Sequence, residues 1–198
     1  MKKVFCILMM MPLVVGLNSC GSLLKTPSNT DPGATTTENQ ITWGEMTGNF
    51  NDLWSFVSNQ SYATSNNALA QALLPVLIEL LNKTPAAEAY LFNADKSYSQ
   101  FWTSNQPNDP ETGLFKESGT YVLKDRDLTF TYKDGQTGET KTEVYKIVSL
   151  SATQLVLYKD VLGIWGELGA SIVGPFDKIG AMPKSAYKII TYSRYVAQ

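Results

Sequence analysis

The chain has 198 residues, of which 43% are hydrophobic, 11% aromatic and 17% charged, a composition typical of a globular domain. Sixteen basic and 18 acidic residues give a formal net charge of −2, which is too little positive charge for a nucleic-acid-binding surface. The sequence has no histidine, and its two cysteines, Cys6 and Cys20, lie within the first twenty residues, which excludes histidine-based catalysis, Ser-His and Cys-His nucleophiles, and metal sites built from His or Cys.

The N-terminus predicts an export signal followed by a lipid-attachment site. Lys2 and Lys3 precede an apolar run over residues 4–17, which is shorter than a membrane-spanning helix requires. The next residues, Leu17-Asn18-Ser19-Cys20, resemble the lipobox of bacterial lipoproteins, in which the cysteine thiol is lipidated and becomes the first residue of the mature chain. The alternative is an ordinary secreted protein with a chance cysteine near its cleavage site.

Removal of residues 1–19 leaves 14 basic and 18 acidic residues and a single cysteine whose thiol carries the lipid. The mature domain therefore has no intramolecular disulfide and depends on its hydrophobic core. Gly21 follows the cysteine, and in lipoproteins that resemble this one a residue other than Asp implies sorting to the outer membrane. Because no acidic cluster follows Cys20, we favour an anchor that faces the periplasm over one on the cell surface.

The mature chain begins with a tether and continues as one domain. Residues 20–40 contain the lipidated cysteine and then mostly Ser, Thr, Pro, Gly and Asn, with too few large apolar residues to favour an ordered structure. Random-coil scaling gives this tether an end-to-end distance of about 25 Å. From residue 41 the composition becomes aromatic-rich, so we expect one domain over residues 41–198 and a monomeric protein.

The first half of this domain predicts one strand and one helix. Apolar and polar residues alternate over residues 53–57, which favours a strand, although the preceding Asn-Asp could instead cap a short helix. A helix is predicted over residues 66–82, with Asn66 or Asn67 as its N-cap and with Pro75 bending or splitting it. Nearly all faces of this helix are apolar, which indicates burial between other elements. It could plug one mouth of a barrel or simply pack against the core.

The rest of the chain predicts an antiparallel meander. Short segments rich in β-branched and aromatic residues alternate with turn residues over 90–92, 97–102, 119–123, 128–132, 140–150, 155–159 and 186–196. With the first strand these make eight, and pairing of the last strand with the first would close a barrel of the size that is either filled by side chains or holds one small ligand. A second helical insertion, a short helix plus a loop, is expected over residues 161–182.

Three segments suggest a family. The stretches Tyr90-Leu-Phe-Asn-Ala-Asp-Lys-Ser-Tyr98, Gly119-Thr-Tyr121 and Tyr145-Lys-Ile-Val-Ser-Leu-Ser-Ala-Thr-Gln-Leu155 resemble the lipocalin-like domains of small lipoproteins of Gram-negative bacteria, of the Bacteroidetes type. In that pattern a glycine usually occupies the turn position held here by Lys96. The resemblance implies a mainly β fold, an antiparallel eight-stranded lipocalin-like barrel with two helical insertions at about 66–82 and 161–182. It implies no catalytic residues and names no ligand.

Carboxylate pairs are the only catalytic groups that the composition leaves open. Asp125 and Asp127 lie in a predicted turn, where such residues are common, and the other acidic residues are scattered, so we expect neither an enzyme nor a metal site nor a cofactor. Aromatic residues either fill the barrel or line a ligand cavity. By alternation, the ligand-binding candidates are Trp54, Tyr98, Trp102, Phe130, Tyr132 and Tyr145, together with Leu73 on the helix.

Two hypotheses about function follow, besides a carboxylate hydrolase that we hold as a minor third. In the first, an anchored barrel binds a small apolar or amphipathic molecule in the cell envelope. In the second, a filled barrel is a structural or accessory protein whose surface docks a protein partner, for example through Trp43, Leu162, Ile164 and Trp165. The amount of space inside the barrel distinguishes the two.

Overall fold

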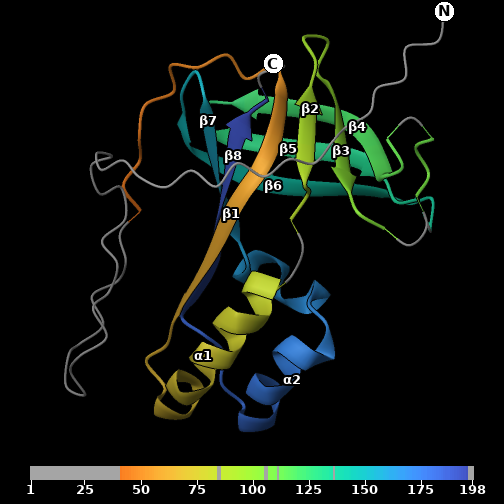
Figure 1. The fold of residues 1–198 in the computed structure, drawn as a ribbon. Helices are drawn as coiled ribbons and strands as arrows, with labels where there is room; N and C mark the ends of the chain where they lie inside the picture. Colours follow the sequence, from red (N-terminus) through yellow and green to blue (C-terminus); the bar gives the residue numbers. More distant parts are fainter. Residues whose placement is uncertain (1–40, 84–85, 105–106, 111, 136, 196–198) are drawn as a thin grey trace, which may run out of the picture.

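The computed structural model describes residues 41–83, 86–104, 107–110, 112–135 and 137–195. The predicted signal peptide, Cys20 and the tether lie outside these residues. The described chain divides into a β-barrel and, beneath it in Figure 1, a layer of helices.

Eight antiparallel strands form a closed barrel in which each strand pairs with the next, and the last pairs with the first. Their bounds are β1 (Leu53–Thr64), β2 (Ala89–Phe92), β3 (Ser97–Trp102), β4 (Phe115–Lys124), β5 (Asp127–Lys133), β6 (Thr140–Leu150), β7 (Gln154–Asp160) and β8 (Ser185–Arg194). The predicted eight-stranded antiparallel barrel is confirmed. The strand reading of residues 53–57 is confirmed too, and β1 extends seven residues further than expected.

Both helical insertions are present where the sequence placed them. Helix α1 (Ala68–Lys83) begins at Asn67, whose side-chain oxygen accepts hydrogen bonds from the N–H groups of Leu69 and Ala70 at 2.9 and 3.0 Å. Pro75 lies inside α1 without splitting it. The second insertion contains a short 3-10 helix, η1 (Leu162–Glu167), and then α2 (Ala170–Ile179), which ends at Gly180 with a left-handed backbone (φ 61°).

The protein has two separate hydrophobic clusters. One lies inside the barrel, and the other joins α1, η1 and α2 to the ends of β1 and β8 through Ala63 and Ala186. Figure 1 shows that β1 and β8 continue past the other strands to reach the helices. The expectation that α1 is buried on nearly all sides is wrong, because Leu69 is 64% and Val76 is 52% exposed.

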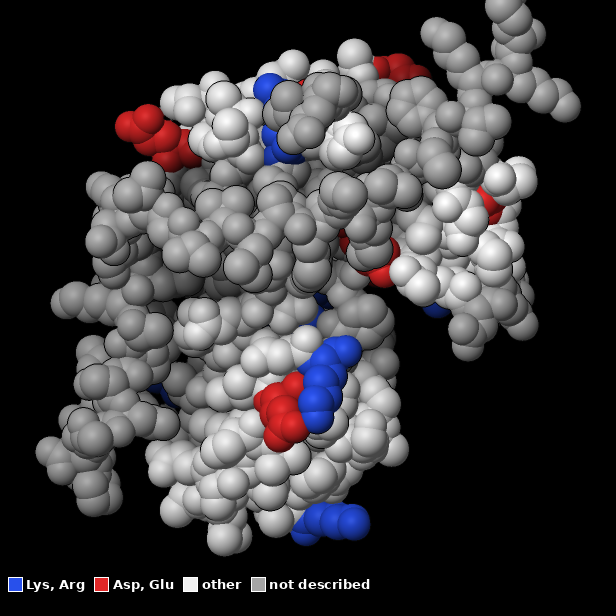
Figure 2. All heavy atoms as spheres, in the orientation of Figure 1, with Lys and Arg blue, Asp and Glu red and all other residues white. Residues whose placement is uncertain are grey.

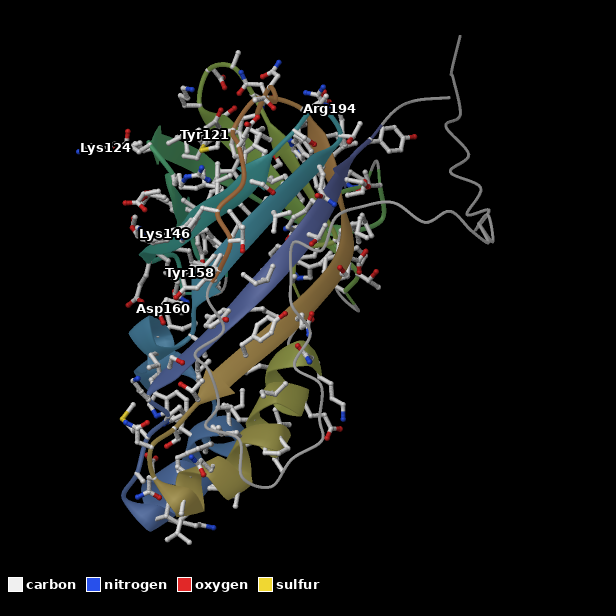
Figure 3. All side chains as sticks on the ribbon, turned by 90° about the vertical axis from the view of Figure 1, so that its left-hand side faces the viewer. Tyr121, Lys124, Lys146, Tyr158, Asp160 and Arg194 are labelled. Atoms are coloured by element: carbon white, nitrogen blue, oxygen red, sulfur yellow. The ribbon has the colours of Figure 1, made fainter. Side chains whose placement is uncertain are left out.

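Residues 41–52 close the other end of the barrel. Phe50 packs against Phe92 and Tyr121, with ring centroids 4.1 and 5.3 Å apart, and so belongs to the barrel core. Figure 3 shows Tyr121 at the upper end of the barrel and Asp160 near the helices. Arg126 holds the segment in place, because its guanidinium donates to the carbonyl oxygens of Gly44, Ile147 and Val148.

Candidate functional site: the polar half of the barrel interior

The interior of the barrel has an aromatic half and a polar half. Along β8 the inward positions run from Ala186, in the helical cluster, through Lys188 to Ile190 and Tyr192 in the barrel core. The polar half therefore lies between the helical layer and the aromatic half.

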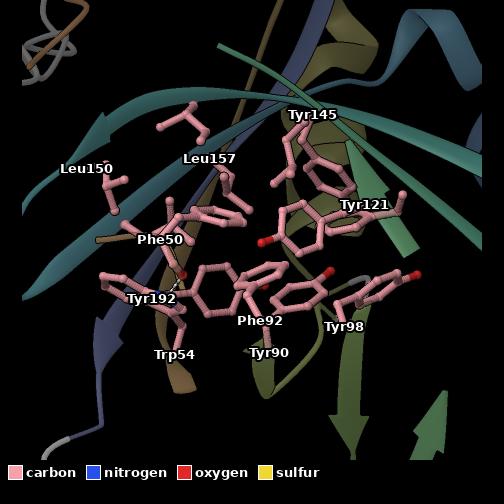
Figure 4. Packing of buried hydrophobic residues seen from close by; sticks show 14 of the residues in the cluster. Phe50, Trp54, Tyr90, Phe92, Tyr98, Tyr121, Tyr145, Leu150, Leu157 and Tyr192 are labelled. Carbon is pink, nitrogen blue, oxygen red and sulfur yellow. Dashed lines mark hydrogen bonds between the residues drawn. The ribbon is translucent and has the colours of Figure 1, made fainter. Parts of the chain in front are cut away.

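The aromatic half is densely packed. Phe130 lies at the centre of a group of rings whose centroids are 4.6–5.9 Å from its own: Tyr90, Phe92, Tyr98 and Tyr145. Figure 4 shows the rings of Tyr90, Phe92 and Tyr98 next to one another, with Trp54 and Tyr192 at one side. Trp54, Tyr98 and Phe130, three of the predicted ligand contacts, belong to this packed group and are at most 2% exposed.

The polar half is organised around Glu143 on β6. Its carboxylate accepts hydrogen bonds from the hydroxyl groups of Tyr132 and Tyr145, both at 2.8 Å, and from the Nζ of Lys159 at 2.7 Å. Lys159 also donates to the Tyr145 hydroxyl oxygen at 3.2 Å and lies 4.9 Å from the centre of that ring. Two predicted candidates, Tyr132 and Tyr145, are thus parts of one ionic network inside the barrel wall.

This network sets the charge states of its members. Burial alone would raise the pKa of Glu143, but the positive charge of Lys159 and the three hydrogen bonds outweigh it and hold the pKa below its usual value. Burial and the negative charge of Glu143 raise the pKa of Tyr132 and Tyr145. At neutral pH Glu143 is therefore a carboxylate, and Tyr132 and Tyr145 are neutral phenols.

Further polar groups line the same half on β3 and β4. The Gln100 amide donates to the Glu117 carboxylate at 2.7 Å. Burial raises the pKa of Glu117, and the nearby charges of Asp134 and Glu143 add to this effect. The Tyr98 hydroxyl points to this half, since Glu117 and Glu143 both raise its pKa after burial does. It is buried and has no hydrogen-bond partner within the described residues.

On the wall of the barrel opposite β3 and β4, Lys188 of β8 lies beside Ser61 of β1. Lys188 is 6% exposed, and burial together with the charge of Lys159 lowers its pKa to about 8. The Ser61 hydroxyl is also buried and makes no hydrogen bond to any described residue. Two buried hydroxyl groups, on Tyr98 and Ser61, thus lie on the walls of the polar half with hydrogen-bonding capacity unused.

The polar half is less enclosed than the aromatic half. Gln100, Trp102, Glu117 and Tyr132 are half-buried, whereas the aromatic cluster is fully buried. Trp102, another predicted candidate, packs against Phe115 at this edge with the rings tilted and their centroids 5.0 Å apart. A surface depression of about 330 Å³ over β4 and β5 is lined by Ser118, Gly119, Thr120, Thr131, Tyr132, Lys133 and Thr140. Tyr132 lines this depression and also binds Glu143, so it connects the two.

The structure separates one predicted candidate from the others, and it adds residues that sequence reasoning did not include. Leu73 packs in the helical cluster, away from the barrel interior. The added residues are Gln100, Glu117, Glu143, Lys159 and Lys188. The sequence does contain a signal for the last three, because each is in phase with inward apolar residues: Glu143 with Tyr145, Lys159 with Leu157, and Lys188 with Ile190.

The structure gives both turn carboxylates structural roles. Asp127 forms an ion pair with Lys146 at 2.5 Å on the surface, and Asp125 adopts a left-handed conformation (φ 55°) in the turn between β4 and β5. Within the described ranges, no three acidic residues gather in a way that could bind a metal ion. No helix in that same part of the chain has the length and apolar character needed to cross a membrane.

Comparison with known proteins links part of the chain to a protein family model. No curated protein sequence and no solved structure is significantly similar to this chain. Residues 79–157, which extend from the last turns of α1 to β7 and include Tyr98, Glu117, Tyr132, Glu143 and Tyr145, match the family model of a lipocalin-like domain.

Proposed function

We propose that the protein is a binding module that holds a small amphipathic molecule in its barrel, with the polar part of the molecule at the Glu143–Lys159 network and the apolar part against the aromatic half. The observation that carries this proposal is the position of that network, which lies inside the barrel wall and directly beside buried rings. A lipocalin-like barrel is a fold suited to binding one small ligand in its interior.

A partly buried ion pair at this position is weak evidence of a stabilising role. Desolvation of two charges offsets most of their attraction, and apolar residues of similar size usually stabilise a core at least as well. Charged and polar groups that converge at the edge of an apolar interior are instead typical of ligand sites, where a few polar groups fix the orientation of the ligand. The buried hydroxyls of Tyr98 and Ser61 supply further hydrogen-bonding capacity to such a ligand.

We further propose that the module is held at the outer membrane, facing the periplasm, by a lipid on Cys20. The lipobox-like sequence supports this proposal. A Cys20→Ser variant should be released from membranes or remain unprocessed, because a thiol is required for lipidation. Retention of this variant in the membrane fraction after a high-salt wash would contradict the anchor. The groups of the Glu143–Lys159 network are suited to orienting a ligand, so we propose binding and no enzymatic activity.

Binding can be tested with 1-anilinonaphthalene-8-sulfonate, an amphipathic probe whose fluorescence rises in apolar surroundings. We expect saturable binding to the full mature chain. Gln100→Trp, which places a large ring in the polar half, should weaken binding at least tenfold. Val122→Trp is the matched control, because Val122 is 64% exposed on the outside of β4 and should leave binding unchanged. Equal probe binding by both variants, or none by the unmodified protein, would contradict the proposal.

The packed aromatic half favours a second candidate function, a filled barrel that docks a protein partner. Its proposed surface needs revision, however. Trp43 is 45% exposed and lies near Tyr158, whereas Trp165 is 9% exposed and packs against Phe176 in the helical layer. Trp165 therefore does not contribute to an exposed patch with Trp43. Absence of probe binding in a stable, folded protein would favour this second function.

A further inference from the structure

Helix α1 presents an apolar face that no other described element covers. Leu69 and Val76 are seven residues apart, so they lie on the same side of the helix two turns from each other, and both are more than half exposed. Leu73 lies between them and is partly buried. Met182, 52% exposed, lies two residues before Lys184, whose N–H donates to the carbonyl of Thr64 at 2.7 Å, four residues before α1 begins.

The helical layer is also poor in charge. Residues 66–83 and 161–184 contain three basic and three acidic residues, so the whole net charge of the mature chain, −4, belongs to the barrel and the tether. On α1 itself the charged residues are Glu79 and Lys83, which are exposed on the same side of the helix as Val76, toward its C-terminal end, and neutralise each other in an ion pair at 2.5 Å. Figure 2 shows that few charged side chains lie on the visible face of the lower, helical part of the molecule.

We propose that this apolar face, made by Leu69, Val76 and Met182, rests on the surface of the lipid bilayer to which the protein is anchored. The inference rests on the proposed anchor at Cys20. A neutral apolar face avoids the repulsion that anionic headgroups exert on the acidic barrel. Exposed leucine, valine and methionine side chains on a helix are the groups that enter the boundary between headgroups and acyl chains.

The tether makes so small a face sufficient. Three exposed side chains bind a membrane weakly on their own, but an anchored domain meets the surface at a high effective concentration, so that docking becomes an intramolecular step. A fully extended tether of twenty residues is about 70 Å long. The distance that it must cover is set by β1, whose twelve residues run from the barrel to the helices and span about 40 Å. The chain is therefore long enough for the helical end to turn toward the membrane.

This orientation also explains where the polar half lies. Lys188 and Ser61 are on the segments of β8 and β1 between the helical layer and the aromatic half. A domain that rests on its helices would hold the polar half on the membrane side of its aromatic core. The amphipathic ligand of the proposed binding function would then enter from the bilayer side.

The test uses the full lipidated chain in vesicles of phosphatidylethanolamine and phosphatidylglycerol. Because lipidation occupies the thiol of the mature chain, Leu69→Cys introduces the single site for a nitrobenzoxadiazole label. We expect label fluorescence to rise severalfold on vesicles and to be quenched by doxyl-labelled lipids. Val122→Cys is the matched control, since both side chains are 64% exposed, and its label should remain unquenched.

The outcomes separate the docking proposal from the anchor. Protein that does not float with vesicles would refute the anchor, whereas protein that floats with equal signals at both labels would refute docking. In detergent, the label fluorescence of Leu69→Cys could instead increase with protein concentration. That result would show that a second copy of the chain covers the face, and it would overturn the proposal. A label at the exposed Ala72→Cys should lose its quenching when Leu69→Ser and Val76→Ser are added, with thermal stability unchanged.

Discussion

Lys96 occupies a position that favours glycine, which gives a sharp test of the turn between β2 and β3. Its backbone is left-handed (φ 68°), and its N–H and C=O groups bind the carbonyl of Asn93 and the N–H of Tyr121 at 3.2 and 2.8 Å. These hydrogen bonds use only the backbone, so a glycine retains them. Lys96→Gly should therefore relieve the steric cost that a side chain imposes at this φ.

The magnitude follows from two opposing terms. A residue with a Cβ in the left-handed region costs about 1–2 kcal/mol, and the greater freedom of glycine in the unfolded chain offsets about 0.5–1 kcal/mol of the gain. The Lys96 ammonium lies 5.3 Å from the centre of the Tyr121 ring, a contact worth about 0.5–1 kcal/mol at an exposed site. Lys96→Ala removes that contact while keeping a Cβ, so it isolates the conformational term.

We expect Lys96→Gly to be more stable than Lys96→Ala by about 0.5–1 kcal/mol, which for a domain of this size is a difference in melting temperature of about 1–4 °C. Urea denaturation followed by tryptophan fluorescence, with thermal unfolding followed by circular dichroism, measures the difference. If Lys96→Gly proves equal to or less stable than Lys96→Ala, the left-handed conformation at this turn is not the source of strain.

Three further predictions concern other parts of the fold. Arg126→Met removes hydrogen bonds to three carbonyl groups and should lower the free energy of unfolding by about 2–3 kcal/mol in urea titrations, while the exposed control Lys124→Met should change it by less than about 0.5 kcal/mol. Leu77→Ala, at a side chain 1% exposed, should cost about 2–5 kcal/mol, and the partly buried Leu73→Ala clearly less; equal losses would contradict the placement of α1. The Lys188 pKa is lowered to about 8 in the folded protein, so between about pH 8 and pH 10 the folded state has released a proton that the unfolded chain still holds. The free energy of unfolding should therefore rise over this pH range. Lys188→Met should abolish the rise and stabilise the protein at pH 7.

The sequence predicted the barrel well because its signals are local. Turn residues such as those around Lys96 separate segments of alternating polarity, and a two-residue period needs only a few residues to be recognised. The start of β4 was predicted too late, at residue 119 instead of Phe115, because Lys116, Glu117 and Ser118 lack β-branched or aromatic character. Their pairing with Gln100 and its neighbours on β3 overrides that weak propensity.

The candidate site was harder to predict because the pattern within each strand does not show which residues of neighbouring strands meet. Glu143 and Lys159 meet because β6 and β7 pair, and a bulge between Ile147 and Ser149 shifts that pairing by one residue. Leu150 faces the interior, and Glu143 is seven residues before it. If β6 alternated without the bulge, an odd separation would place the Glu143 side chain outside the barrel. Contacts between strands that do not pair with each other, such as that between Tyr98 on β3 and Phe130 on β5, likewise depend on how the barrel curves.

Closure of the barrel by β1 and β8 has a consequence for how the chain folds. Trp54 pairs with Arg194, 140 positions later in the sequence, whereas β4, β5 and β6 are joined by short turns. Local hairpins form early, and the entropy of closing so long a loop makes the β1–β8 seam a late event. During synthesis the nascent chain thus lacks the strand that seals the barrel until β8 has emerged. Under the export that we propose, this late closure would keep the polypeptide extended while it passes through a narrow translocation channel.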